Sequence, residues 1–263
     1  MKKMMTFMIM LSLLAGCSKS TLPVTNDTEV NSLSNKKLEW GLKRNKNAVP
    51  DINPGSDEIL QKYDAYYLGD PQSKDIYLTF DEGYENGYTA QILDVLKKEK
   101  VPACFFVTGP YVKQETELIK RMVNEGHEVG NHTVNHPSMP SVQSTEKLEQ
   151  EMLDLDRMFY DTTGRSMKFM RPPMGEFSER TLAVTQRLGY KTVFWSIAYM
   201  DWDINKQPGS EYVYRSVLDY LHGGAVILMH AVSRDNANTL ERIIRDAKAG
   251  GYTFQPLTAL PSK

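Results

Sequence analysis

From residue 76 onward, short apolar segments alternate along the chain with longer segments of mixed polarity. The short segments lack a strict apolar–polar alternation, which favours strands that are covered on both faces, as in a parallel sheet. The longer segments carry apolar residues at helical spacing, so they are expected to be amphipathic helices. The pattern predicts strands at 76–80, 101–107, 127–132, 168–172, 192–197, 225–230 and 252–256.

Helices between these strands are indicated by apolar stripes and by glycines where C-terminal caps belong. The stripes are Ile92, Val95 and Leu96; Leu118, Ile119, Met122 and Val123; Leu148, Met152, Leu155 and Phe159; and Leu240, Ile243, Ile244 and Ala247, with Gly126, Gly164, Gly189 and Gly250 as the caps. Repeated strand–helix units predict an α/β fold with a parallel sheet. We expect a distorted (β/α) barrel of about seven parallel strands. The pattern alone leaves an open doubly wound sheet as the alternative.

Composition changes this picture little. With 263 residues, 41% of them hydrophobic and 24% charged, the chain suits one barrel-sized domain better than two small ones. The net charge of -2 gives no basis for binding nucleic acid or for strong attraction to an anionic membrane. No nucleic-acid partner is therefore expected, and the chain is expected to be a monomer.

The N-terminus is predicted to be a targeting signal. Two lysines precede an apolar segment, 6–15, that is too short to span a bilayer. The region ends in Leu14-Ala15-Gly16-Cys17, which resembles the lipobox of bacterial lipoproteins. We expect residues 1–17 to be a lipoprotein-type signal peptide and Cys17 to carry a membrane anchor; an ordinary signal peptide is the alternative. Either signal predicts an extracytoplasmic protein, located in the cell envelope as a membrane-anchored lipoprotein in the first case.

Two segments precede the first predicted strand. Residues 18–37 are rich in Ser, Thr, Asn and Lys and are predicted to be a flexible tether. The folded domain is expected at 38–263, with 38–75 packed irregularly against it. Apart from Cys17 the only cysteine is Cys104, in an apolar run, so no internal disulfide is possible and an inert core thiol is expected.

Polar residues that can carry chemistry follow most of the predicted strands. In a parallel barrel or sheet such residues meet at the C-terminal edge of the strands, where α/β proteins bind their ligands. A lone histidine or carboxylate at a strand end is usually structural, so their joint placement is the informative observation. These residues are Asp81 and Glu82, His132 and His136, Arg171, Asp201 and Trp202, and His230.

The residue types at this edge fit hydrolysis of an amide or ester by a metal-activated water. His132 and His136 have the H-x-x-x-H spacing that places two imidazoles on one face of a helical turn, and with a carboxylate they suit zinc or another divalent metal. Of two adjacent carboxylates, one can bind metal while the other acts as a general base that Arg171 keeps ionised. A histidine across the site can protonate the leaving amine.

These motifs resemble the five motifs of the polysaccharide deacetylase (NodB-homology) family over residues 76–257, most closely those of the delta-lactam-biosynthetic de-N-acetylases. The similar segments are Trp40-Gly-Leu-Lys-Arg44, Thr79-Phe-Asp-Glu-Gly-Tyr-Glu-Asn-Gly-Tyr88, Phe194-Trp-Ser-Ile-Ala-Tyr-Met-Asp-Trp202 and His230-Ala-Val-Ser-Arg-Asp-Asn236. The resemblance implies a distorted (β/α) barrel that removes N-acetyl groups from N-acetylmuramic acid in the glycan strands of peptidoglycan. The freed amine could then close on the lactyl carboxyl to form the delta-lactam of spore cortex.

The resemblance also implies a role for each site residue. Asp81 would be the base, His230 the acid, Arg171 the residue that orients Asp81, and Asp201 the partner of Arg171; Trp202 and Tyr84 would bind the sugar, and the backbone N–H of Met174 the oxyanion. His132, His136 and Glu82 would bind the metal, with zinc expected and cobalt or nickel as alternatives. Two positions depart from the family pattern. Glu82 replaces a second aspartate, which moves its carboxylate by roughly 1.5 Å, and Ala198 stands where many relatives have an acidic residue.

Three other functions stay open at this point. A phosphoryl-transfer enzyme could use Asp81 as nucleophile but has no need of the histidine pair. A non-catalytic glycan-binding module could keep Trp202 but has no need of base, acid and metal ligands together. A deacetylase of N-acetylglucosamine in peptidoglycan or of chitin-type glycans would share all the motifs.

Overall fold

The computed structural model describes residues 26–261, so the predicted signal peptide and Cys17 lie outside the described residues. The main sheet has the strand order β11-β5-β6-β7-β8-β10-β4, and β12 pairs with the start of β5. All of these pairs are parallel, as the sequence predicts. The strands are β4 (Ala65–Tyr66), β5 (Asp75–Glu82), β6 (Cys104–Val107), β7 (Glu128–Asn131), β8 (Phe169–Met170), β10 (Lys191–Val193), β11 (Val226–His230) and β12 (Thr253–Phe254).

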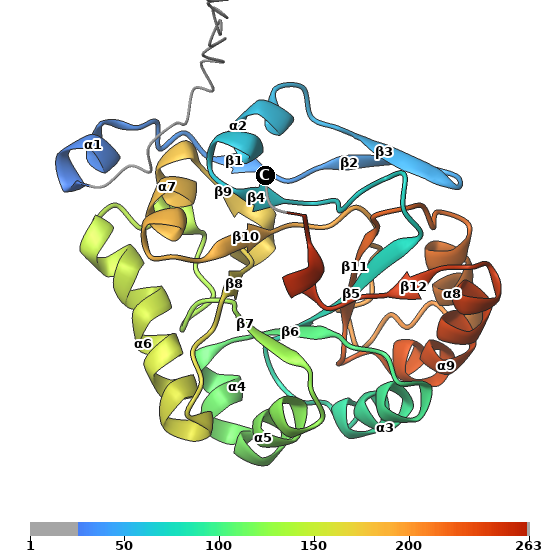
Figure 1. Cartoon of the computed structure of the whole chain (residues 1–263). Helices are drawn as coiled ribbons and strands as arrows, with labels where there is room; N and C mark the ends of the chain where they lie inside the picture. The colour runs from blue at the N-terminus through green and yellow to red at the C-terminus, as the bar shows by residue number, and fades with distance from the viewer. Residues whose placement is uncertain (1–25, 262–263) are drawn as a thin grey trace, which may run out of the picture.

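The sheet curls into the predicted distorted barrel. The segment after β10 reaches β11 at the far side of the strand order, where Ile197 forms an isolated parallel bridge with Ile227. Figure 1 shows the larger helices around the outside of the strands. The helices are α1 (Asp27–Ser32), α2 (Ser56–Lys62), α3 (Thr89–Glu99), α4 (Gly109–Gln114), α5 (Thr116–Asn124), α6 (Thr145–Thr163), α7 (Glu179–Arg187), α8 (Ser210–Leu218) and α9 (Arg234–Ala249). None of the helices in the described residues is long and apolar enough to cross a membrane.

Short elements complete the fold around the barrel. Strand β1 (Leu38–Glu39) pairs antiparallel with β9 (Glu176–Phe177), and β2 (Leu42–Asn45) pairs antiparallel with β3 (Ala48–Ile52). Three turns are 3-10 helices: η1 (Met139–Ser141), η2 (Pro173–Gly175) and η3 (Leu257–Ala259). The β1–β9 pair holds the N-terminal segment beside η2, which lines the site described below.

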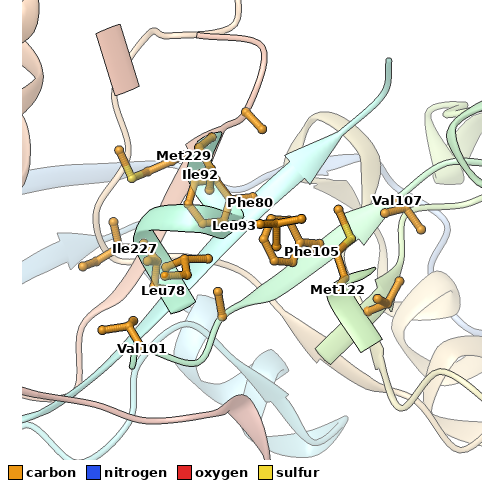
Figure 2. Packing of buried hydrophobic residues seen from close by; sticks show 14 of the residues in the cluster. Leu78, Phe80, Ile92, Leu93, Val101, Phe105, Val107, Met122, Ile227 and Met229 are labelled. Atoms are coloured by element: carbon orange, nitrogen blue, oxygen red, sulfur yellow. The ribbon is translucent and has the colours of Figure 1, made fainter. Parts of the chain in front are cut away.

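The apolar core has two layers because successive side chains of a strand point to opposite faces of the sheet. On β5, Leu78 and Phe80 belong to the outer cluster under the helices, and Figure 2 shows them near Ile92 and Leu93 of α3. Tyr77 belongs to a separate cluster with Cys104, Phe106, Phe169 and Val193, inside the barrel. This alternation also decides where the last two residues of β5 point, which matters for the site.

The structure corrects several expectations about the elements. The stretch 26–37, predicted as part of a tether, instead contains α1, whose Val30 is fully buried, and Ser34 accepts a hydrogen bond from the backbone of Arg180. Strand β4 was not predicted. Gly250 was expected to cap the C-terminus of α9, but the residue with the positive φ after this helix is Gly251. Cys104 is buried and unpaired as expected, and burial raises the pKa of its thiol well above the ordinary value.

Candidate active site

Asp81 and Arg171 form a buried ion pair at the C-terminal edge of the barrel. Arg171 is fully buried, and its Nη1 donates to Oδ1 of Asp81 over 2.8 Å. The rest of the guanidinium donates to the carbonyl oxygens of Val193 and Phe194 and lies over the ring of Phe106. Burial, the largest single influence, would raise the pKa of Asp81, but the charge and hydrogen bond of Arg171, with smaller contributions from His132 and His230, together lower that pKa. Asp81 is therefore ionised and held in one orientation.

His132 follows β7 and faces the free oxygen of Asp81. Its Nδ1 lies 2.8 Å from the carbonyl oxygen of Arg171, which can only accept a hydrogen bond, so Nδ1 carries the proton. Burial lowers the pKa of His132 to about 4, which leaves the ring neutral and Nε2 with a free lone pair. That Nε2 lies 3.6 Å from Oδ2 of Asp81.

His136 approaches His132 through an irregular turn. The ring centroids of the two histidines are 4.8 Å apart and the rings are inclined by 70°. The predicted helical turn is wrong: residues 132–136 are not helical, and Thr133 and His136 have φ angles of 65° and 54°. The backbone N–H of His136 donates to Oγ1 of Thr133, which fixes this turn. The predicted proximity of the two imidazoles is nevertheless present.

The donors at this point fit a divalent metal. A neutral imidazole nitrogen and a carboxylate oxygen, both carrying lone pairs, face each other across 3.6 Å, and a cation between them would relieve their repulsion. His136 adds a second imidazole, and burial lowers its pKa as well. Within residues 26–261 no group of three His, Cys, Asp or Glu side chains is close enough to hold a metal ion on its own.

Glu82 is not brought to this site. β5 continues through Glu82, so its side chain points to the opposite face from Asp81, toward the helix layer. Glu82 is fully buried, does not line the cavity at the site, and neither carboxylate oxygen has a hydrogen-bond partner. Burial raises the pKa of Glu82 well above its ordinary value, and the nearby charge of Glu85 adds to this shift, so the protonated form of the carboxyl is favoured. The prediction of Glu82 as third metal ligand does not match this geometry.

His230 ends β11 beside Asp81. The two residues are paired neighbours in the parallel sheet, so their side chains leave it on the same face. Burial, the largest single influence, would lower the pKa of His230, but the charge and hydrogen bond of Asp201, 2.7 Å from Nδ1, together with the charge of Asp81, raise it. The predicted pairing of Asp201 with Arg171 is wrong, because Asp201 contacts the ring of His230 and accepts from its backbone N–H.

Asn236 is a site residue to which sequence analysis assigned no role. Its Nδ2 donates to Oδ2 of Asp201 over 2.6 Å and to the carbonyl oxygen of His230 over 2.9 Å. Its Oδ1 accepts from the hydroxyl of Tyr199. Asn236 lies at the first turn of α9, six residues after His230, and this position inside the quoted His230–Asn236 segment was the only indication of its role.

A cavity of about 730 Å³ lies over these groups. Trp202, 54% exposed, meets the ring of His230 edge-on at 5.7 Å and stands at the rim of this cavity. Met174 has a φ of 58°, in the left-handed region that is uncommon for a residue with a side chain. Seven of the ten predicted site residues line the cavity: Asp81, Tyr84, His132, His136, Met174, Trp202 and His230; Arg171 and Asp201 lie beneath them, and Glu82 points away.

The fold and the site define a hydrolase that acts on an amide bond, and the chain belongs to the polysaccharide deacetylase family. The family model described as Polysaccharide deacetylase matches residues 68–193. The chain is 44% identical over 246 residues to the peptidoglycan-N-acetylmuramic acid deacetylase PdaA of Bacillus subtilis, with 93% of each chain covered. The solved structure of Bacillus subtilis PdaA, a family 4 carbohydrate esterase, has a TM-score of 0.84 at 46% identity, covering 87% of this chain and 98% of that chain. A peptidoglycan-N-acetylglucosamine deacetylase of Bacillus cereus is 35% identical over 192 residues, with 71% of this chain and 88% of the relative covered.

Proposed function

We propose that this protein hydrolyses the N-acetyl group of N-acetylmuramic acid in peptidoglycan, releasing acetate and leaving a free amine on the sugar. The observation that carries the proposal is the pairing of Asp81 with His230. These residues are neighbours on adjacent strands, they line one cavity, and their surroundings shift their pKa values in opposite directions. One is an ionised base and the other a protonated acid, which is the pair that amide hydrolysis by water needs.

Asp81 acts first, as the general base. Its Oδ1 is occupied by Arg171, so Oδ2 is the oxygen that accepts a proton from the attacking water. The water oxygen then forms a bond to the acetyl carbon. The resulting negative charge develops on the former carbonyl oxygen, and the backbone N–H of Met174 is the donor proposed to receive it. This assignment is supported by two observations: Met174 lines the cavity, and its φ of 58° lies in the left-handed region.

His230 acts second, as the general acid. The amine of the sugar is a poor leaving group unless its nitrogen receives a proton as the C–N bond breaks. Asp201 keeps His230 protonated and Asn236 holds Asp201 in place, so the proton is available on the far side of the ring, at Nε2. Acetate and the amine are the products, and the water has supplied one oxygen and two hydrogens.

A bound metal would lower the pKa of the attacking water and polarise the acetyl carbonyl. His132 and His136 would hold that metal beside Asp81, and zinc is the ion we propose, with cobalt or nickel as alternatives. Trp202 and Tyr84 are proposed to contact the sugar. Both are about half exposed at the cavity rim, which leaves their rings free to meet a ligand.

The proposal includes a location and a product. Peptidoglycan lies outside the cytoplasm, and the lipobox-like sequence ending at Cys17 supports a lipoprotein anchor. Replacing Cys17 by Ser is expected to release the protein from the membrane fraction, and a variant that stays there after salt washing would contradict the anchor. The freed muramic amine could cyclise with the lactyl carboxyl to a delta-lactam during sporulation.

The deciding experiment is mass spectrometry of purified peptidoglycan after incubation with the enzyme. Intact glycan and glycan stripped of stem peptides are compared, and both are digested to disaccharides so that the sugar that lost an acetyl group is identified. Loss from the muramic residue supports the proposal. Loss from N-acetylglucosamine assigns the alternative substrate, and no loss with a metal-loaded wild type contradicts deacetylation of peptidoglycan. Asp81→Asn is the control for spontaneous hydrolysis.

A further inference from the structure

An arm near the start of the described chain reaches the active-site cavity. The arm, residues 37–42, contains β1, and Leu42 at its end lines the cavity. Figure 1 shows β1 beside β9, the strand that directly follows the turn η2. The mechanism proposed above uses the backbone of η2 but no residue of the arm. Trp40, within the arm, begins one of the segments quoted from the sequence, and it has so far been given no role.

The turn η2 has a backbone conformation that depends on its surroundings. Met174 and Gly175 have φ angles of 58° and 67°, so both lie in the left-handed region. This region is unfavourable for Met174, which carries a side chain, and such conformations persist where neighbouring groups fix them. Within the turn, the N–H of Gly175 donates to the carbonyl oxygen of Pro172 over 3.0 Å. The carbonyl oxygen of Gly175 accepts from outside the turn, from the backbone N–H of Trp40 over 2.8 Å.

The side chain of Trp40 attaches this part of the arm to the barrel wall. Its ring is buried and stacks on the ring of Phe194, with the two ring centroids 4.9 Å apart. Its Nε1 donates to the carbonyl oxygen of Trp195 over 2.9 Å. A Cβ added at Gly175 would lie 3.1 Å from Cβ of Trp40 and 2.8 Å from Cη2 of Trp195. The turn is therefore packed between Trp40 on one side and Trp195 on the other.

We propose that Trp40 is a positioning residue for the oxyanion donor. It fixes η2 so that the backbone N–H of Met174 is in place when negative charge develops on the acetyl oxygen. This inference rests on the proposed function. Trp40 does not itself line the cavity, so it acts through the turn and not by touching the substrate. A donor that is fixed before the reaction stabilises the developing charge without reorganisation, and a displaced donor loses much of that effect.

The test compares Trp40→Ala with wild type on two substrates, a peptidoglycan glycan strand and para-nitrophenyl acetate, an activated ester that carries no sugar. Both reactions place negative charge on an acetyl oxygen, so kcat should fall by at least about tenfold on both. KM for the glycan should stay within about twofold of wild type, because the lost interaction belongs to the transition state. Both limbs of the pH profile and the metal content should be unchanged.

Two further variants separate positioning from stability. Trp40→Phe keeps a ring to stack on Phe194 but lacks the Nε1 donor, so its kcat should fall by only about threefold. Leu60→Ala is the matched control, because Leu60 is fully buried in the same apolar cluster but lies on α2 and does not line the cavity. It should lower the thermal stability, as Trp40→Ala does, and keep kcat within about twofold of wild type. If Trp40→Ala does not fold, an unchanged kcat in Trp40→Phe overturns the proposal.

Three other results would overturn it. Wild-type kcat in Trp40→Ala, or an equal loss in Leu60→Ala, would show that the arm has no specific effect on catalysis. A loss on the glycan alone would assign the arm to sugar binding. A shifted acid limb would show that Trp40 acts instead through Phe194, whose carbonyl oxygen accepts from Arg171 over 3.2 Å.

The proposed function fails separately. Wild type that hydrolyses the ester but releases no acetate from peptidoglycan would refute the proposed substrate, and the ester rates of the variants would still decide the role of Trp40. If wild type hydrolyses only the glycan, the separate effects on kcat, KM and the pH limbs decide that role on the glycan.

Discussion

The two ends of strand β7 carry similar residues in very different surroundings. At its C-terminal end, His132 faces Asp81 across a cavity of about 730 Å³. At its N-terminal end, His127 and Glu128 line a cavity of about 430 Å³ on the other side of the barrel. There Nδ1 of His127 accepts from the backbone of Ala103, and the Glu128 carboxylate accepts from two backbone N–H groups near η3. The N-terminal groups tie segments of backbone together, whereas the C-terminal groups face one another.

A shifted pKa does not separate these two ends. Burial lowers the pKa of His127 to about 4, and that of His132 to about 4 as well. What differs is the atom that each ring leaves free and what that atom meets. His132 directs a lone pair toward a carboxylate in an open cavity, while Nε2 of His127 is buried without a partner. The contacts of each buried histidine, and not its pKa, therefore show which end of β7 can take part in catalysis.

The largest contrast is expected between Asp81→Asn and Glu128→Gln. Asp81→Asn removes the general base, so kcat should fall at least about a hundredfold. Glu128→Gln keeps a hydrogen-bond acceptor for the backbone of η3 and lies at the other end of the barrel, so kcat should stay within about twofold of wild type. Acetate release from peptidoglycan measures both, with thermal unfolding as the check on folding. Similar losses in the two variants would remove the functional distinction between the two ends.

The second contrast concerns metal. His132→Ala should lower the metal content measured by elemental analysis, with most of the activity lost, whereas His127→Ala should retain the metal. Glu82→Gln should retain both metal and activity, because its side chain lies on the opposite face of β5 from Asp81. Undiminished metal in His132→Ala would contradict the role of the histidine pair, and loss of metal in Glu82→Gln would restore Glu82 as a ligand.

Much of this site could be predicted because parallel strands end at one edge. Asp81 and His230 each follow an apolar run, and such runs are recognisable when both faces of a strand are buried. The error at Glu82 came from a strand boundary. With a strand expected to end at residue 80, both carboxylates could turn toward the metal, but β5 includes them both and alternation separates them.

Other features had no local pattern to reveal them. β4 has only two residues and lies in a segment without periodicity, so its place in the sheet depends on its pairing with β10. The partner of Asp201 could not be read from residue types, because an aspartate can pair equally well with an arginine or a histidine. Val30 is one apolar residue in a polar stretch, and its burial depends on tertiary packing alone.

A smaller effect on activity is expected from Asp201→Asn, as a shift of the pH profile. The profile of kcat/KM should be bell-shaped, with the alkaline limb set by loss of the proton on His230. Asp201 raises the pKa of His230, so its neutral replacement should move that limb to lower pH and reduce activity at pH 8 more than at pH 6. Below about pH 6, where a histidine is largely protonated in both proteins, the activity of the variant should approach that of wild type more closely. An unmoved alkaline limb would assign it to another group.

The smallest effect on catalysis, and a clear one on stability, is expected at the N-terminal end from His127→Gln. The pKa of His127 is lower in the folded protein than its ordinary value, so protonation favours the unfolded chain. Above the ordinary pKa of 6.5, His127 is neutral in both the folded and the unfolded protein and does not reduce stability. As the pH falls toward 4, protonation of His127 in the unfolded chain lowers the free energy of unfolding by up to about 3 kcal/mol. Burial raises the pKa of Glu128, so protonation of Glu128 in acid favours the folded protein and opposes the effect of His127. The pH dependence of wild type alone therefore does not isolate His127. The free energy of unfolding of His127→Gln relative to wild type should therefore improve between pH 7 and pH 4.5, by about 2 to 3 kcal/mol, while acetate release at neutral pH stays unchanged. A pH-independent difference between the two proteins would show that His127 is not held neutral by its burial.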